Sequence, residues 1–337
     1  MSGGASAAPA ARTEKLTLAQ AVNRGLAEEM RRDPRVLVMG EDVGVDGGVF
    51  RVTEGLLEAF GPERVLDTPL AESGIVGAGL GLALTGYRPV CEIQFSGFVY
   101  PALNQIFAHV ARYRNRSRGR YAVPMVIRMP YGGGIHPPEH HSESYEALFC
   151  NTPGLKVVIP STPYDAKGLI VSAIRDDDPV VFCESERIYR AFREEVPEGD
   201  YAVPIGKAKV VAEGEDVTLI AYGSMTRQAV EARDALARES VAAEVLDLRT
   251  VCPLDVEAIL GSVEKTGRAV VIHEAPRNTG VGAEVAALIQ ERALLSLQAP
   301  VQRVCGYDAV FPFPLLENHY LPDRERIVRA ARAALDF

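Results

Sequence analysis

Residues 217–248, VTLIAYGSMTRQAVEARDALARESVAAEVLDL, decide the fold class of this chain. The apolar run Val217–Tyr222 predicts a buried strand, Thr226–Arg238 has helical spacing, and Ala243–Leu248 is a second apolar run. Solid apolar strands that alternate with helices are typical of parallel sheets covered by helices on both faces. The stretch therefore predicts an α/β architecture.

The same alternation extends in both directions along the chain. Further strands are predicted at Val36–Gly40, Pro89–Phe95, Met125–Met129, Lys156–Pro160, Val180–Glu184, Ala269–His273 and Val301–Cys305. Further helices are predicted at Leu18–Arg31, Gly74–Leu84, Pro101–Arg114, Pro163–Arg175, Leu254–Glu264, Ala283–Leu295 and Arg324–Leu335. The fold class that follows is α/β.

Two domains are expected, because the chain has 337 residues and a domain takes roughly 100–200. The segment Phe192–Pro204 is rich in charge, Pro and Gly and lacks a periodic apolar face, which is typical of a boundary. We predict a flexible N-terminal tail, a first domain, a linker and a second domain at residues 1–15, 16–191, 192–204 and 205–337.

Composition excludes several classes of protein. The net charge is −9, from 36 Lys and Arg against 45 Asp and Glu, which argues against a nucleic-acid binder. No apolar run reaches the length of about 18 residues that a membrane helix needs. The five cysteines are widely spaced and no secretion signal is seen, so we expect a cytoplasmic protein with reduced cysteines.

The glycine-rich stretch Gly74–Gly81 lacks the last glycine of the Gly-x-Gly-x-x-Gly dinucleotide fingerprint. This disfavours a nicotinamide-dependent oxidoreductase. Small residues at helical spacing instead predict a helix in tight packing, for example at a subunit interface. Glu72 begins this helix, either as a cap or as a carboxyl aimed into a cleft.

Three of the six histidines lie within residues 136–141, in a segment that follows a predicted strand. Because Pro137 and Pro138 prevent a helix there, a zinc site is disfavoured. A mobile active-site loop and a plain surface loop both remain open.

Three further polar features have simple structural explanations as well as functional ones. The five arginines of Arg112–Arg120 form a solvated turn or contact an acidic partner. The acidic turn Asp176–Asp178 is solvated or holds a cation. His273, at the end of a predicted strand, is a site residue or a satisfied core histidine.

Blocks of sequence from about Leu16 to Pro322 resemble the beta subunit of the thiamine-diphosphate-dependent 2-oxoacid dehydrogenases. They are Gly40–Gly44, Asp67–Gly77, Arg88–Phe95, Cys150–Val158, Asp165–Leu169, Asp247–Thr250 and His273–Pro276. The resemblance implies a pyrimidine-binding domain followed by a transketolase C-terminal-like domain. Cys305–Asp308 and Phe311–Pro314, together with Ile75-Val76 and Glu92–Phe95, favour the branched-chain type, with pyruvate or acetoin as the alternative substrate.

The resemblance also implies roles for individual residues. Glu72 matches the glutamate that contacts N1′ of the aminopyrimidine, and His141 matches the catalytic histidine. Phe98 matches the aromatic residue that packs on the aminopyrimidine. Leu70 and Gln94 match positions that line the pocket. The carbonyl of Ala173, with Asp176 and Asp178, matches a potassium site of some members.

The implied partners complete the expected function. An alpha subunit in an α2β2 assembly shares the thiamine diphosphate and binds magnesium, because this chain lacks the Gly-Asp-Gly motif that does so in the family. We therefore expect the chain to be inactive alone, and with its partner to decarboxylate a 2-oxoacid and acylate a lipoyl group on an acyltransferase. A non-catalytic scaffold is the rival hypothesis, which the presence of both Glu72 and His141 disfavours.

Overall fold

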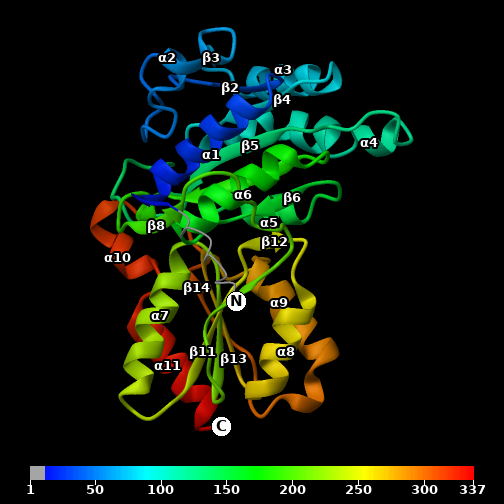
Figure 1. Cartoon of the computed structure of the whole chain (residues 1–337). Coiled ribbons are helices and arrows are strands. Elements are labelled where there is room, and N and C mark those ends of the chain that lie inside the picture. Colours follow the sequence, from blue (N-terminus) through cyan, green and yellow to red (C-terminus); the bar gives the residue numbers. More distant parts are fainter. Residues whose placement is uncertain (1–11) are drawn as a thin grey trace, which may run out of the picture.

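The computed structural model describes residues 12–337, which form two large sheets, each covered by helices on both faces, and one separate pair of strands (Figure 1). The first sheet has seven strands in the order β12 (Thr250–Cys252), β6 (Lys156–Val158), β7 (Val180–Ser185), β5 (Val126–Tyr131), β4 (Arg88–Glu92), β2 (Val36–Gly40) and β3 (Val65–Asp67). The second sheet has five, in the order β14 (Gln302–Gly306), β13 (Ala269–Pro276), β10 (Val217–Ala221), β11 (Ala243–Asp247) and β9 (Lys209–Ala212). Only β12 and β9, both at sheet edges, are antiparallel to their neighbours. The predicted α/β fold is confirmed.

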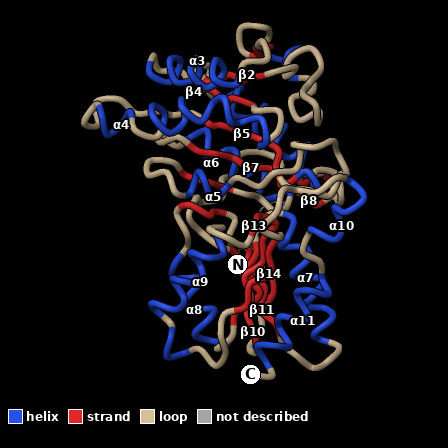
Figure 2. The backbone as a smooth tube through the Cα atoms, turned by 180° about the vertical axis from the view of Figure 1, so that it is seen from behind, coloured by secondary structure: helices blue, strands red, loops and turns tan. Residues whose placement is uncertain are grey.

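One face of the first sheet is covered by α1 (Leu18–Arg32) and α6 (Pro163–Arg175). Its other face packs on α3 (Glu72–Leu84), α5 (Glu146–Cys150), the 3-10 helix η1 (Ser96–Ala102) and the π-helix η2 (Gln105–Val110). In the second sheet, α7 (Ser224–Ala237) and α11 (Arg324–Leu335) cover one face, and α8 (Val256–Thr266) and α9 (Val281–Arg292) cover the other (Figure 2). The remaining helices are the short α2 (Leu56–Phe60), α4 (Tyr113–Arg116), α10 (Glu317–Tyr320), η3 (Glu186–Ile188), η4 (Leu294–Ser296) and η5 (Pro314–Leu316).

A single apolar cluster joins the two halves of the molecule. It contains Ile75 and Val99 beside the first sheet, and Ile220 and Val285 beside the second. Strand β12 strengthens this connection, since it follows the second sheet's β11 in sequence but pairs with β6 of the first sheet. One edge of the first sheet is therefore formed by a strand from the second half of the chain.

Two segments expected to be irregular form strands instead. Residues Thr13–Leu16 form β1, which pairs antiparallel with β8 (Glu194–Pro197), a strand inside the expected linker. Residues 1–11 of the expected tail lie outside the described residues. Both strands are short and form an isolated two-stranded pair, so neither carries the long apolar run that marks a strand in sequence.

The helix predicted at Pro101–Arg114 is broken into η1, η2 and α4. Pro101 lies inside η1, where a proline removes one backbone donor and disfavours a continuous α-helix. No helix within residues 12–337 is long and apolar enough to cross a membrane.

Candidate functional site

Two carboxylates lie at the ends of neighbouring parallel strands. Glu41 directly follows β2, and Glu72 begins α3 shortly after β3, which pairs with β2 so that Gly40 lies opposite Asp67. Such strand ends are where open α/β sheets place their sites. Glu72 is only 7% exposed. Burial and, next, the negative charge of Glu72 raise the pKa of Glu41.

The Glu72 carboxylate accepts no hydrogen bond from any residue of the described chain. The residue is buried but its carboxylate oxygens are not among the fully buried unpartnered atoms, so they are accessible to a ligand donor or acceptor. Helix α3 packs against η1, the helix that carries Phe98. Glu72 and Phe98, two residues named from the sequence, thus lie on packed neighbouring elements.

An aromatic group surrounds the imidazole of His141. The ring centroid of His141 lies 4.6 Å from that of Phe95 and 4.9 Å from that of Phe98, both in edge-to-face geometry. Phe98 and His141 are therefore brought together as the resemblance implied. Phe95 is a further member that the sequence reasoning did not single out.

A backbone hydrogen bond fixes the tautomer of neutral His141. Its Nδ1 lies 2.8 Å from the carbonyl oxygen of Glu139, which can only accept, so Nδ1 carries the proton. The Nε2 of neutral His141 then has a free lone pair and can take up a proton. His140 instead pairs with Glu143, with 3.2 Å between Nδ1 and Oε1, and its ring stacks on Tyr100.

The other two predicted pocket residues lie closer to solvent. Leu70 is 78% exposed in the loop before α3. The side chain of Gln94 donates to Asp42 at 3.0 Å, near the end of β2.

In the acidic turn after α6, the two carboxylates that match a potassium site are paired with cations of this chain. The carboxylate of Asp176 binds the Lys156 ammonium at 2.7 and 2.8 Å, and Asp178 pairs with Arg114 at 2.5 Å. These cations neutralise the two carboxylates, so a potassium site with the carbonyl of Ala173 stays a prediction. Across residues 12–337, no group of three or more His, Cys, Asp and Glu side chains could hold a metal ion.

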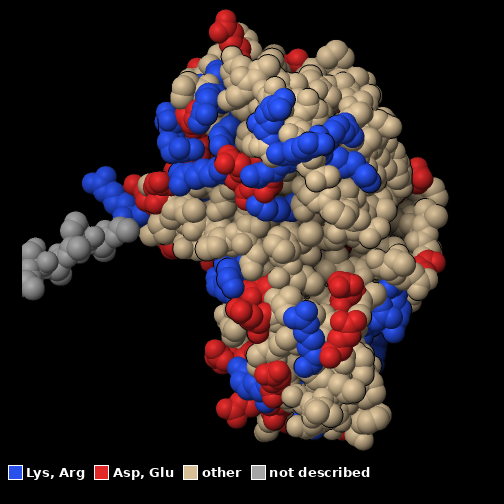
Figure 3. Space-filling view, turned by 90° about the vertical axis from the view of Figure 1, so that its right-hand side faces the viewer, with Lys and Arg blue, Asp and Glu red and all other residues tan. Residues whose placement is uncertain are grey.

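Other sequence candidates have structural roles. His273 is fully buried, its Nδ1 donates to the carbonyl of Ala275 at 3.0 Å, and burial lowers its pKa to about 4. The arginines of Arg112–Arg120 lie on and after α4, on a face where Lys and Arg side chains gather (Figure 3). Of these, Arg114 is neutralised by Asp178.

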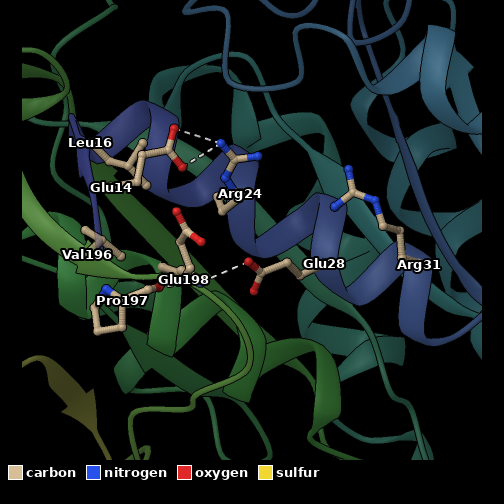
Figure 4. A pocket seen from close by; sticks show the side chains of 9 residues that line it. Glu14, Leu16, Arg24, Glu28, Arg31, Val196, Pro197 and Glu198 are labelled. Atoms are coloured by element: carbon tan, nitrogen blue, oxygen red, sulfur yellow. Dashed lines mark hydrogen bonds and ion pairs between the residues drawn. The ribbon is translucent and has the colours of Figure 1, made fainter. Parts of the chain in front are cut away.

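A separate polar pocket of about 290 Å³ lies between α1 and β8 (Figure 4). Its charges pair among themselves: Arg24 binds Glu14 at 2.6 Å, and buried Lys167 binds Glu28 at 3.0 Å. It contains none of the candidate site residues.

The predicted stripe of small residues on α3, Gly74, Gly77 and Gly81, is packed only loosely within this chain: a Cβ at Gly77 would lie 3.6 Å from the Gln105 side chain. A Cβ at Gly81 would meet nothing within 4 Å, whereas one at Gly79 would lie 2.4 Å from the Cys91 sulfur. Tight packing inside the chain is therefore at Gly79, on the opposite side of the helix from the predicted stripe.

Comparison with known proteins is consistent with this geometry. Residues 14–191 match the family model "Transketolase, pyrimidine binding domain", and residues 206–327 match "Transketolase, C-terminal domain". A solved structure, "Split gene transketolase, inactive beta4 tetramer", superimposes with a TM-score of 0.79 at 25% identity, over 95% of this chain and 99% of that one.

Curated relatives match along nearly the whole chain. The pyruvate dehydrogenase E1 component subunits beta of Staphylococcus epidermidis and Bacillus subtilis are each 54% identical over 96% of this chain and 99% of their own length. The subunit of Staphylococcus aureus is 53% identical over the same shares.

These relatives show that the branched-chain prediction is wrong, and they favour its pyruvate alternative. At least one residue of the C-terminal blocks is buried in the core of the second sheet rather than placed at the candidate site. Cys305, for example, lies in β14 with its sulfur 3.4 Å from His273 Nε2, inside the second sheet. The chain belongs to the family of thiamine-diphosphate-dependent 2-oxoacid dehydrogenase E1 beta subunits.

Proposed function

We propose that this chain is the beta subunit of a pyruvate dehydrogenase E1 component. The observation that carries the proposal is the 54% identity to such subunits over 96% of the chain. In this proposal the complex decarboxylates pyruvate and transfers the acyl group to a lipoyl group of an acyltransferase.

The residues at the strand ends suit an aminopyrimidine. A buried carboxyl that lacks a partner, Glu72, matches a ring nitrogen in need of a hydrogen bond, and the Phe98 ring offers an apolar face. Thiamine diphosphate, when bound, supplies the carbon nucleophile that attacks the 2-oxo carbon. The carboxyl of Glu72 would form the hydrogen bond to N1′ of the aminopyrimidine.

His141 would handle protons at the mouth of the site. Its Nε2 is free because Nδ1 is committed to Glu139, and its ring is held between Phe95 and Phe98. A positioned acid or base of this kind contributes about 10²–10⁴-fold to rate. We assign His141 the protonation of the lipoyl sulfur during acyl transfer.

The alpha subunit would supply the magnesium and diphosphate ligands, since no group of described residues here could hold a metal ion. The open small-residue face of α3, around Gly81, is a surface where a partner backbone could approach closely. We place an alpha-subunit contact there, within an α2β2 assembly. The division of the chain at residues 192–204 fits the gap between the two matched family models.

The test is to co-express the chain with the alpha subunit of its own host and to measure 2-oxoacid decarboxylation by dye reduction. We expect kcat/KM for pyruvate to exceed that for 3-methyl-2-oxobutanoate by at least about tenfold, since the branched substrate has about two more carbons and a single methylene changes kcat/KM by about 10–200-fold. Acetoin is included as a third substrate. Preference for the branched substrate or for acetoin would contradict the proposal.

A further inference from the structure

The loop that carries His141 starts from three consecutive glycines. It leaves β5 at Tyr131 and reaches α5 at Glu146. The amide of Gly132 donates to the carbonyl of Glu143 at 3.1 Å, which closes the loop on itself. Gly132 and Gly134 have φ values of +81° and +110°, a backbone region that glycine adopts without strain.

The next two amides are bound by carboxylates from the other half of the molecule. Gly133 N–H donates to Glu274 Oε2 at 3.0 Å, and Gly134 N–H donates to Glu317 Oε1. Glu274 lies on β13 and Glu317 begins α10, so both belong to the part of the chain that forms the second sheet and its helices. Both are buried. The base of the loop is thus attached to the second half of the molecule by two charge-assisted hydrogen bonds.

This attachment requires the glycines. A Cβ at Gly132 would lie 2.5 Å from Glu274 Oε2, and one at Gly133 would lie 2.5 Å from the ring of Phe311. With a side chain at either position, Glu274 or Phe311 would have to move away from the loop. The local sequence is therefore adapted to bring this backbone against the second half of the molecule.

Glu143 connects the attached base to His141. Its carbonyl accepts from Gly132 N–H and from Ser96 Oγ at 2.5 Å. Its carboxylate accepts from Ser142 N–H at 3.1 Å and pairs with His140. His141 lies between His140 and Ser142 in the sequence, and both bind the Glu143 carboxylate. A shift of the glycines at the start of the loop would therefore shift Glu143 and, with it, the imidazole of His141.

We propose that Glu274 and Glu317 are positioning residues that fix His141 for proton transfer by holding the Gly133 and Gly134 amides. The expected effect on lipoyl acylation rests on the proposed function, whereas the attachment of the loop does not. Neither glutamate lies in the aromatic group around His141; each acts through the loop. A misplacement of about 1 Å can cost roughly 10²-fold in rate.

The kinetic test is a double-mutant cycle in the α2β2 complex. We expect Glu317→Ala to lower kcat for lipoyl acylation by about tenfold, with little change in KM for pyruvate, and Glu317→Gln, which keeps an acceptor oxygen, to restore most of it. In a His141→Ala background, Glu317→Ala should have almost no further effect. Independent, multiplicative losses would overturn the proposal, because a general structural defect acts without His141.

The matched control is Glu186→Gln. Glu186 is buried beside Glu274 and Glu317, but both of its carboxylate oxygens lack a hydrogen-bond partner and it does not bind the loop. Its kcat should equal that of the wild type. Equal losses in Glu186→Gln and Glu317→Ala would overturn the proposal.

A second readout needs no turnover. Amide hydrogen exchange of the peptide covering residues 131–146 should speed up by about tenfold in Glu274→Ala and Glu317→Ala, but not in Glu186→Gln. Unchanged exchange would overturn the proposal. If the complex prefers another 2-oxoacid, only the proposed function is contradicted. The positioning role is then still tested by hydrogen exchange and by the double-mutant cycle measured with that substrate.

Discussion

Two groups of buried carboxylates in this chain differ in how their charge is compensated. In the first, the Arg128 network, Arg128 on β5 binds Glu184 on β7 at 2.6 and 2.8 Å and also pairs with Glu92 on β4. In the second, the boundary acids, Glu186, Glu274 and Glu317 lie together where the two halves of the molecule meet.

The difference is that a buried cation forms ion pairs in the Arg128 network. Arg187 lies near Glu274 and lowers its pKa, but among the described residues no ion pair joins a cation to the boundary acids. Within the Arg128 network, burial raises the pKa of Glu92 only to about 6, because Arg128 opposes the effect. Among the boundary acids, burial and then the charges of Glu274 and Glu317 raise the pKa of Glu186 to about 9. The first group is therefore held by ion pairs, whereas the second depends on protons and on backbone amides.

Removing the cation should have the largest effect. Arg128→Met would leave Glu92 and Glu184 buried without their partner, so we expect a loss of about 3–5 kcal/mol in the free energy of unfolding. The measurement is denaturant unfolding of the assembled complex. Arg114→Met is the control: its pair with Asp178 is half exposed, and such pairs contribute only about 0–1 kcal/mol. Similar losses in the two variants would contradict the contrast.

Glu72 extends the comparison to the proposed site, because it too is buried without a cation and lies beside another acid. Glu72→Gln keeps the volume but cannot supply the same proton. We expect α2β2 assembly to persist, as seen by native mass spectrometry, while pyruvate decarboxylation falls by about 100-fold or more. Turnover close to that of the wild type would remove Glu72 from the mechanism.

The fold could be predicted from local pattern because its strands are solid apolar runs. Every strand predicted from the sequence overlaps an observed one, from β2 to β14. The strands that were missed are short or at edges, such as β1, β8 and β12, and they exist through pairing with distant segments. A pattern of 3 or 4 residues carries too little periodicity to reveal them.

The site was less accessible to sequence reasoning. Glu72, Phe98 and His141 were found through family resemblance, whereas Glu41, Phe95 and Glu143 were missed as site residues. Glu41 had a local signal, since it directly follows a buried parallel strand. Glu143 had none, because its role comes from contacts with Gly132 and Ser96 that only the folded chain forms.

The smallest expected effect concerns Glu186 and the dependence of stability on pH. Its folded pKa, about 9, lies above the ordinary value of 4.5. Between these values the folded state holds a proton that the unfolded state has released, so stability falls as pH rises. One such group contributes a slope of up to about 1.4 kcal/mol per pH unit. In Glu186→Gln this contribution is absent, and we expect a flatter decline from pH 6 to pH 8.5.

The slope separates this effect from a simple change in packing. A buried amide without partners also costs about 1–3 kcal/mol, but that cost is the same at every pH. Denaturant unfolding at several pH values therefore tests titration through the difference in slope between wild type and variant, whatever the offset. Glu257→Gln, at a side chain 93% exposed, should leave the slope unchanged. Parallel curves for wild type and Glu186→Gln would mean that Glu186 titrates normally, and the boundary acids would then resemble the Arg128 network.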